Sequence, residues 1–130
     1  MASTPAFTST VLVGSGLVPA TLDTSLTAPT NATTIVTAGA SGSKIEEIVF
    51  QAVGTTVAAV LNVFRHDGST YHLIDQVLIE AVTSSTTAVG WRRVRQYSNL
   101  LFANAETLRV SQTVAGNQSL VKVTAFGGSL

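Results

Sequence analysis

Apolar and polar side chains alternate along most of the chain beyond residue 33, and this two-residue period is typical of β-strands with one buried face. In the clearest case, Leu108, Val110 and Val114 fall on one face of the run 107–114. The run 57–66 is apolar on both faces, which favours a central strand. The pattern predicts strands at 33–37, 44–53, 57–66, 70–81, 89–95, 100–102, 107–114 and 120–126.

Turn signals separate these runs. Asp67-Gly68-Ser69 lies between two apolar stretches and predicts a β-hairpin. Polar loops are expected at 39–43 and 83–87, a turn at 116–117, and a glycine tail at 127–128. Asp75 breaks the alternation of its run, which indicates a bulge or a kink there.

Strands spaced about ten residues apart predict one all-β domain, an antiparallel β-sandwich or jelly-roll-like fold of about eight strands. The 17 Val and 19 Thr residues agree with it, because β-branched residues favour strands. One segment competes, since Trp91, Val94, Ser98 and Leu101 fall at roughly helical spacing within 88–105. Gly90 and the missing helix cap make a strand the preferred interpretation of that segment.

Charge divides the chain into two parts. Charged residues make up 11% of the sequence, against about 25% in ordinary soluble proteins, and seven basic residues balance seven acidic ones. Residues 1–43 hold a single charge, Asp23, together with all three prolines. We therefore expect an extended N-terminal arm over residues 1–30 and a β-sandwich body over residues 31–130. Such an arm could add a strand to a neighbouring sheet, because that pairing relies on main-chain hydrogen bonds.

Composition excludes several classes of protein. Binding to nucleic acid by charge needs an excess of basic residues, and this chain has none. There is no cysteine for a disulfide framework and no apolar run long enough to span a membrane. The first residues lack the positive charge of a secretory leader, so we expect synthesis in the cytoplasm.

No catalytic, cofactor or metal site is expected. The sequence lacks the G-x-S-x-G motif of a nucleophile elbow, and Gly14-Ser15-Gly16 lacks the context of a phosphate loop. Two histidines with two aspartates could meet around the predicted hairpin as metal ligands (His66, Asp67, His72 and Asp75). Side chains of an exposed turn are the preferred interpretation of this group. We expect no enzymatic activity.

The segment 91–97 carries the strongest signal for a partner surface, because arginine and aromatic residues are enriched at protein–protein hot spots. In one alternative, Trp91 packs in the core and the arginines pair with glutamates (Glu46, Glu47, Glu80 or Glu106). Nucleic acid or glycan binding is a further alternative. Apolar residues of the arm complete the interface candidates, which are Phe7, Val11, Leu12, Val13, Trp91, Arg92, Arg93, Arg95 and Tyr97.

The stretch 26–37, Leu-Thr-Ala-Pro-Thr-Asn-Ala-Thr-Thr-Ile-Val-Thr, resembles small virion proteins of tailed bacteriophages, in which a Thr-Ala-Pro segment leads into a first strand. The segments 43–49, 60–68 and 105–111 resemble the same group. The resemblance implies a structural protein of the virion, of the capsid decoration or cement type, and carries over no catalytic residue. Collar, tail and baseplate components belong to the same group, and a glycan-binding module on a tail fibre is a further alternative.

Together these observations favour a protein that works by attaching to other proteins. The expected partners are the major capsid protein or other virion proteins, and further copies of the chain, with a trimer as the expected oligomer. Neither nucleic acid nor a membrane is expected as a partner. The expected location is the virion.

Overall fold

The computed structural model describes residues 10–130, which form eight strands and one short 3-10 helix over Ala115–Asn117. The strands are antiparallel wherever they pair. They are β1 (Thr10–Leu17), β2 (Thr33–Thr37), β3 (Ser43–Ala52), β4 (Ala59–His66), β5 (Tyr71–Ile79), β6 (Arg92–Phe102), β7 (Thr107–Gln112) and β8 (Val121–Ser129).

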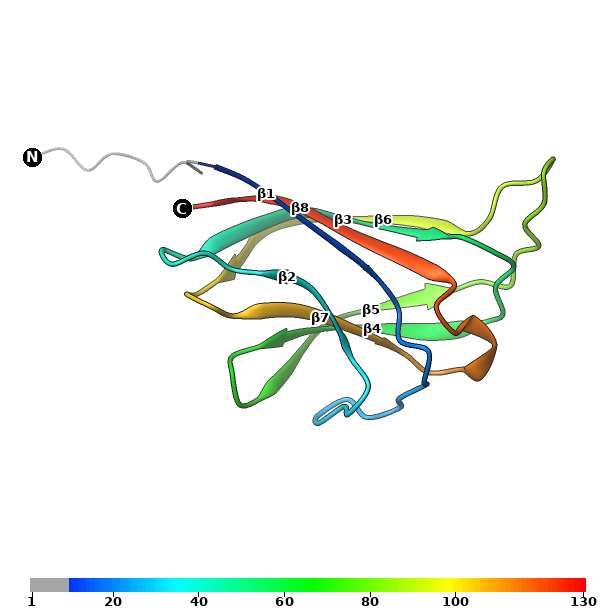
Figure 1. Ribbon diagram of the computed structural model, residues 1–130, viewed down its shortest axis with the longest axis horizontal. Helices are drawn as coiled ribbons and strands as arrows, with labels where there is room; N and C mark the ends of the chain where they lie inside the picture. The colour runs from blue at the N-terminus through cyan, green and yellow to red at the C-terminus, as the bar shows by residue number, and fades with distance from the viewer. Residues whose placement is uncertain (1–9) are drawn as a thin grey trace, which may run out of the picture.

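The strands form two four-stranded sheets that stack as the two layers seen edge-on in Figure 1. Sheet A has the order β1-β8-β3-β6 and sheet B the order β2-β7-β4-β5. The pairs β1/β8, β2/β7, β3/β6 and β4/β5 are therefore nested around the β4–β5 hairpin. This nesting is the arrangement of an eight-stranded jelly roll. The predicted antiparallel β-sandwich of about eight strands is confirmed.

The core lies between the sheets and is built from the inward face of each strand. Ile48 and Phe50 of β3 face Leu61 and Val63 of β4 across the layers, and all four side chains are fully buried. Leu108, Val110, Val121 and Val123 extend this core along β7 and β8. The alternation that predicted the strands is thus the alternation between core and surface.

The segment 88–105 contains the strand β6 (Arg92–Phe102), and the helical alternative is wrong. A bulge interrupts this strand, because residues 97–99 of β6 lie opposite Glu46 alone. Asn99 adopts a positive φ of 112° in this bulge, and Leu100 then faces the core. The irregularity expected at Asp75 is confirmed, because Asp75 pairs with Val63 while Leu73 pairs with Phe64.

The predicted arm differs most from the structure. Residues 10–17 form β1, paired along their whole length with β8, so this part of the arm belongs to the sandwich. Side-chain alternation did not predict this strand, because Gly14 and Gly16 occupy its inward positions. A Cβ at Gly14 would collide with the carbonyl oxygen of Ile35 and with Val36 on β2, so the two strands approach closely only with glycine here. Residues 1–9, including Phe7, lie outside the described residues.

Residues 18–32 connect β1 to β2 beneath sheet B (Figure 1). The Asp23 N–H donates to the carbonyl of Gln112 at 2.9 Å, which ties this connection to β7. The Asp23 carboxylate accepts the N–H groups of Ser25, Thr30 and Asn31. Burial raises the pKa of Asp23, but these hydrogen bonds outweigh burial and leave the pKa below its ordinary value.

The C-terminal end of the chain also differs from expectation. Gly127 and Gly128, expected to form a tail, lie inside β8 and pair with both β1 and β3. No helix in residues 10–130 has the length and apolar character that crossing a membrane requires.

Candidate functional site

Within the segment 91–97, only Trp91 is buried. Trp91 is 3% exposed and packs against Phe50, with ring centroids 6.4 Å apart. Its carbonyl accepts the N–H of Ala52 at 2.8 Å. The structure therefore places Trp91 in the core rather than on a partner surface, because it precedes β6 on the inward side of sheet A. Arg92 is exposed and Arg93 is half-buried.

Two further candidates of this segment join the sheets across one open side of the sandwich. The Tyr97 hydroxyl donates to Asp75 Oδ2 at 2.8 Å, and Arg95 Nε lies 3.5 Å from the same oxygen. Arg95 Nη2 also donates to the carbonyl of Gln76 at 3.2 Å. The partner of Arg95 is thus Asp75 and none of the glutamates considered from the sequence. We call the group Arg95, Tyr97 and Asp75 the β5–β6 latch, and its role is to hold two edge strands together.

The latch has a consequence for stability at high pH. Burial, followed by the hydrogen bond to Asp75, raises the pKa of Tyr97 above its ordinary value of 10. The folded chain therefore favours the neutral phenol. The stability that the neutral phenol gives the folded chain is fully present below about pH 10. It is lost as the pH rises through the pKa of Tyr97 in the folded chain, so the free energy of unfolding should fall in that range.

Tyr97→Phe should lower the free energy of unfolding by about 1 kcal/mol at neutral pH, because Asp75 loses a hydrogen bond. It should also flatten the alkaline decline in stability. Urea unfolding at a series of pH values measures both effects. Tyr71→Phe is the matched control, since it removes a hydroxyl that accepts from Arg109 Nη1 and leaves the latch intact. An equally steep alkaline decline in Tyr97→Phe and wild type would contradict this role of Tyr97.

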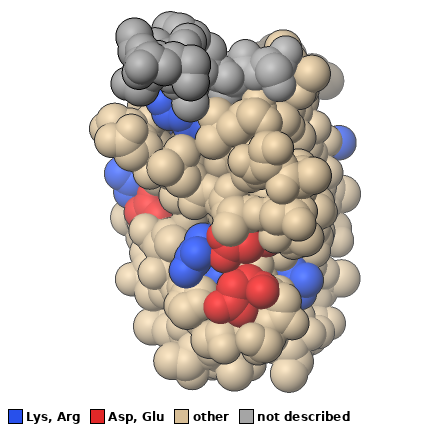
Figure 2. All heavy atoms as spheres, turned by 90° about the vertical axis from the view of Figure 1, so that its left-hand side faces the viewer, with Lys and Arg blue, Asp and Glu red and all other residues tan. Residues whose placement is uncertain are grey.

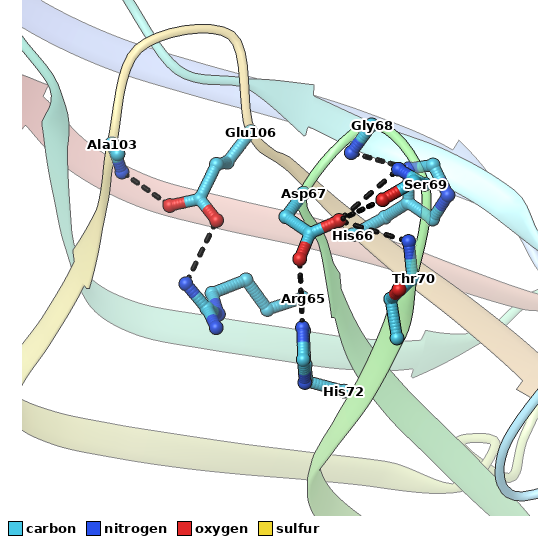
Figure 3. A network of polar contacts seen from close by, with 9 residues as sticks. All are labelled: Arg65, His66, Asp67, Gly68, Ser69, Thr70, His72, Ala103 and Glu106. Atoms are coloured by element: carbon cyan, nitrogen blue, oxygen red, sulfur yellow. Dashed lines mark hydrogen bonds and ion pairs between the residues drawn. The ribbon is translucent and has the colours of Figure 1, made fainter.

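Three of the four residues considered as metal ligands, His66, Asp67 and His72, lie at the β4–β5 turn (Figure 3). Asp75 lies farther along β5, in the latch. Asp67 accepts the N–H groups of Ser69 and Thr70 and contacts His72 Nε2 at 2.9 Å. The His72 contact, followed by these N–H groups, holds the pKa of Asp67 far below its ordinary value. His66 Nδ1 accepts the N–H of Gly68. The described residues contain no cluster of three or more metal-ligating side chains.

A second polar contact lies beside this turn. Arg65 Nη1 contacts Glu106 Oε2 at 2.7 Å, and Glu106 Oε1 accepts the N–H of Ala103. Figure 2 views this end of the sandwich and shows acidic and basic side chains beside one another in a largely uncharged surface. Arg65 and Glu106 pair with each other, and Asp67 contacts His72, so these charges fix the turns between strands.

The four edge strands of the sandwich are not equally protected. Edge strands expose unpaired main-chain groups, and natural proteins guard them with charge, bulges or short length. The β6 edge carries Arg92, Arg93 and Arg95 together with a bulge. The β5 edge carries Asp75 and a bulge, and β2 is five residues long with a register shift.

The edge strand β1 has none of these protections. It runs for eight residues without a charge, a proline or a register shift against β8. Val11 is 86% exposed and Val13 is 54% exposed, although both are apolar. The β1 edge, residues 10–17, is therefore the part of the described chain best suited to pair with another strand.

The free groups of the β1 edge can be assigned from the pairing with β8. The N–H of Val18 donates to the carbonyl of Val121, so residue 18 points its main-chain groups toward β8. Main-chain direction alternates along an antiparallel pair. The N–H and C=O groups of Leu17, Ser15, Val13 and Val11 consequently point away from β8, toward the open edge.

Several residues on the outer face of sheet A share this apolar character, although Lys122 lies opposite Leu17. Val13 pairs with Phe126 of β8, which is 40% exposed, and Leu17 and Leu101 are also exposed on this face. Outer faces of antiparallel sheets are usually polar. Phe126 belongs to the last predicted strand, but the sequence pattern alone did not identify it as an exposed residue beside β1.

Of the nine interface candidates, the structure brings Val11 and Val13 to one exposed strand edge. Leu12, between them, packs against the core. Two shallow hollows lie beside the latch, lined by residues 73–76 and 97–100. Compared with known proteins, the chain matches no protein-family model, no curated protein and no solved structure.

Proposed function

We propose that this protein is a non-enzymatic structural component of a tailed-phage virion, which binds and stabilises the assembled capsid as a decoration or cement protein. The observation that carries the proposal is the unguarded β1 edge. An uncharged eight-residue edge strand with exposed valines favours strand addition, and such an edge is a liability in a protein that does not assemble.

Two further observations support assembly on a virion. The jelly roll is an architecture of viral capsid domains, although lectins and cupins share it, so this is support by analogy of fold. The resemblance of residues 26–37 and 105–111 to small virion proteins points the same way. The partners proposed are the major capsid protein or other virion proteins, in preference to nucleic acid, because Arg95 is already paired with Asp75.

The alternatives are a tail, collar or baseplate component and a glycan-binding module on a tail fibre. Sugar stacking needs exposed aromatic rings, whereas Trp91 is buried and Tyr97 is held by Asp75. Tyr71 is half-buried under the guanidinium of Arg109, 5.5 Å from its ring centroid. These contacts favour the capsid role over the glycan-binding module.

Antibody detection in purified phage particles tests the proposal. We expect the protein to sediment with intact particles and, after heads and tails are separated, to remain with the heads. Heads lacking it should release DNA at a lower temperature, and purified protein should restore the wild-type temperature. Detection on tails would favour the alternative component, and absence from particles would contradict a virion role.

A further inference from the structure

We propose that the strand that pairs with the β1 edge is β1 of a second copy of the same chain, so that two sandwiches share one continuous sheet. The inference deepens the proposed function and rests on it for the choice of β1 as the assembly strand. A two-fold axis perpendicular to the sheet, passing at Gly14, places Val11 opposite Leu17 of the other copy. Val13 then lies opposite Ser15 of the other copy.

The free main-chain groups of β1 are placed to make this pairing. The groups that point away from β8 belong to residues 11, 13, 15 and 17, and the two-fold axis pairs each of them with another member of the same set. Each pair can therefore exchange both main-chain hydrogen bonds of an antiparallel ladder. Side chains decide between the possible registers. An axis at Gly14 sets the apolar Val11 opposite the apolar Leu17, whereas an axis at Val13 would set Val11 opposite the polar Ser15.

Charge also selects a second copy as the partner. Pairing a strand with itself brings like charges close together, which is destabilising. The chain carries no charged side chain before Asp23, so two β1 strands meet without repulsion. The opposite edge of sheet A, β6, would bring Arg92, Arg93 and Arg95 against their own copies.

The size of the contact predicts a weak dimer. A standard interface covers about 800 Å² of each partner, roughly an eighth of the 6839 Å² surface of this chain. Pairing of β1 alone covers less, so we expect a dissociation constant on the order of 10 μM.

Sedimentation equilibrium over a range of concentrations tests the stoichiometry. We expect a reversible species of twice the 13.4 kDa chain mass, because two-fold pairing uses the β1 edge of both copies and closes at two. A monomer at all concentrations up to about 1 mM, or the trimer expected from the sequence, would overturn the inference. The measurement needs no phage particles, so the dimer can be absent while the protein is still found on virions. Equally, the dimer can form while the protein is absent from virions.

Two variants locate the contact. Ser15→Lys places a charge on the open edge and should weaken the dimer at least about tenfold. Ser15→Pro removes an N–H that points away from β8 and should have the same effect without loss of the fold. Thr124→Lys is the matched control, since Thr124 is the β8 neighbour of Ser15 on the same outer face, one strand in from the edge. A dimer that both Ser15 variants leave unchanged would contradict pairing through β1.

Cross-linking tests the register, and the natural chain has no cysteine to interfere. A mixture of Val13→Cys and Ser15→Cys proteins should form a mixed disulfide under mild oxidation, because these residues lie opposite each other. Preferential disulfides between two Val13→Cys copies would place the axis at Val13 and contradict the register centred on Gly14.

Discussion

Gly127→Ala is expected to lower the free energy of unfolding by about 3 kcal/mol or more, which makes it one of the most damaging single substitutions in the chain. Gly127 lies within β8 between Leu12 of β1 and Ile45 of β3. A Cβ at this position would collide with the carbonyl oxygen of Lys44 and the Cα of Ile45. Both atoms are main chain, so the ladder between β3 and β8 must shift. Urea unfolding followed by circular dichroism measures the effect.

Gly16→Ala is the matched control for this prediction. Gly16 also lies in sheet A, but an added Cβ would meet side-chain carbons of Ile35 and Thr33, each at 3.3 Å. Those side chains can adjust, and alanine restricts the unfolded chain, so we expect a change below about 1 kcal/mol. Equal stability of Gly127→Ala and Gly16→Ala would contradict the close packing of main-chain atoms around Gly127.

Arg65→Met should cost about 2 kcal/mol of unfolding free energy. It removes the partner of the Glu106 carboxylate, whose side chain is 8% exposed, and leaves that charge buried. The expected loss is smaller than the roughly 3–5 kcal/mol of a fully buried pair, because 34% of the Arg65 side chain is exposed and solvent screens the contact. Thermal and urea unfolding at neutral pH measure it.

Two comparisons separate this effect from a general loss of charge. Lys44→Met breaks an exposed ion pair with Glu46, 3.7 Å apart, and should change stability by less than about 0.5 kcal/mol. Adding Glu106→Gln to Arg65→Met removes the unpaired charge but keeps an oxygen that accepts the N–H of Ala103, and should recover much of the loss. If the double variant is less stable than Arg65→Met, the cost comes from lost packing instead.

The strands could be predicted where their side chains alternate and where a turn is local. The run 107–114 contains β7, and the Asp67-Gly68-Ser69 hairpin joins β4 to β5, because both depend on neighbouring residues. The conformation of the segment 91–97 was harder to predict, because the bulge of β6 begins at its end and interrupts the strand alternation. Whether Trp91 faces the core or solvent depends on Phe50, which lies about forty residues away in the chain.

The candidate site was only partly predictable for the same reason. The sequence drew attention to Val11 and Val13, but assigned them to an extended arm. Their place on an edge strand depends on the pairing of β1 with β8 at the other end of the chain. The partner of Arg95 and Tyr97, Asp75, was visible only as a break in an alternating pattern, because the latch joins strands of different sheets.

The sequence by itself determined that the chain is an all-β sandwich of about eight strands, nearly uncharged over its first third. Those properties follow from the two-residue period, the β-branched composition and the placement of charge. The tertiary structure decided the nested strand order, and with it which strand is left unpaired at each edge. Strand order depends on contacts between residues far apart in the chain, which no local pattern encodes. It is this order that leaves β1, the one edge without charge or bulge, open to a partner.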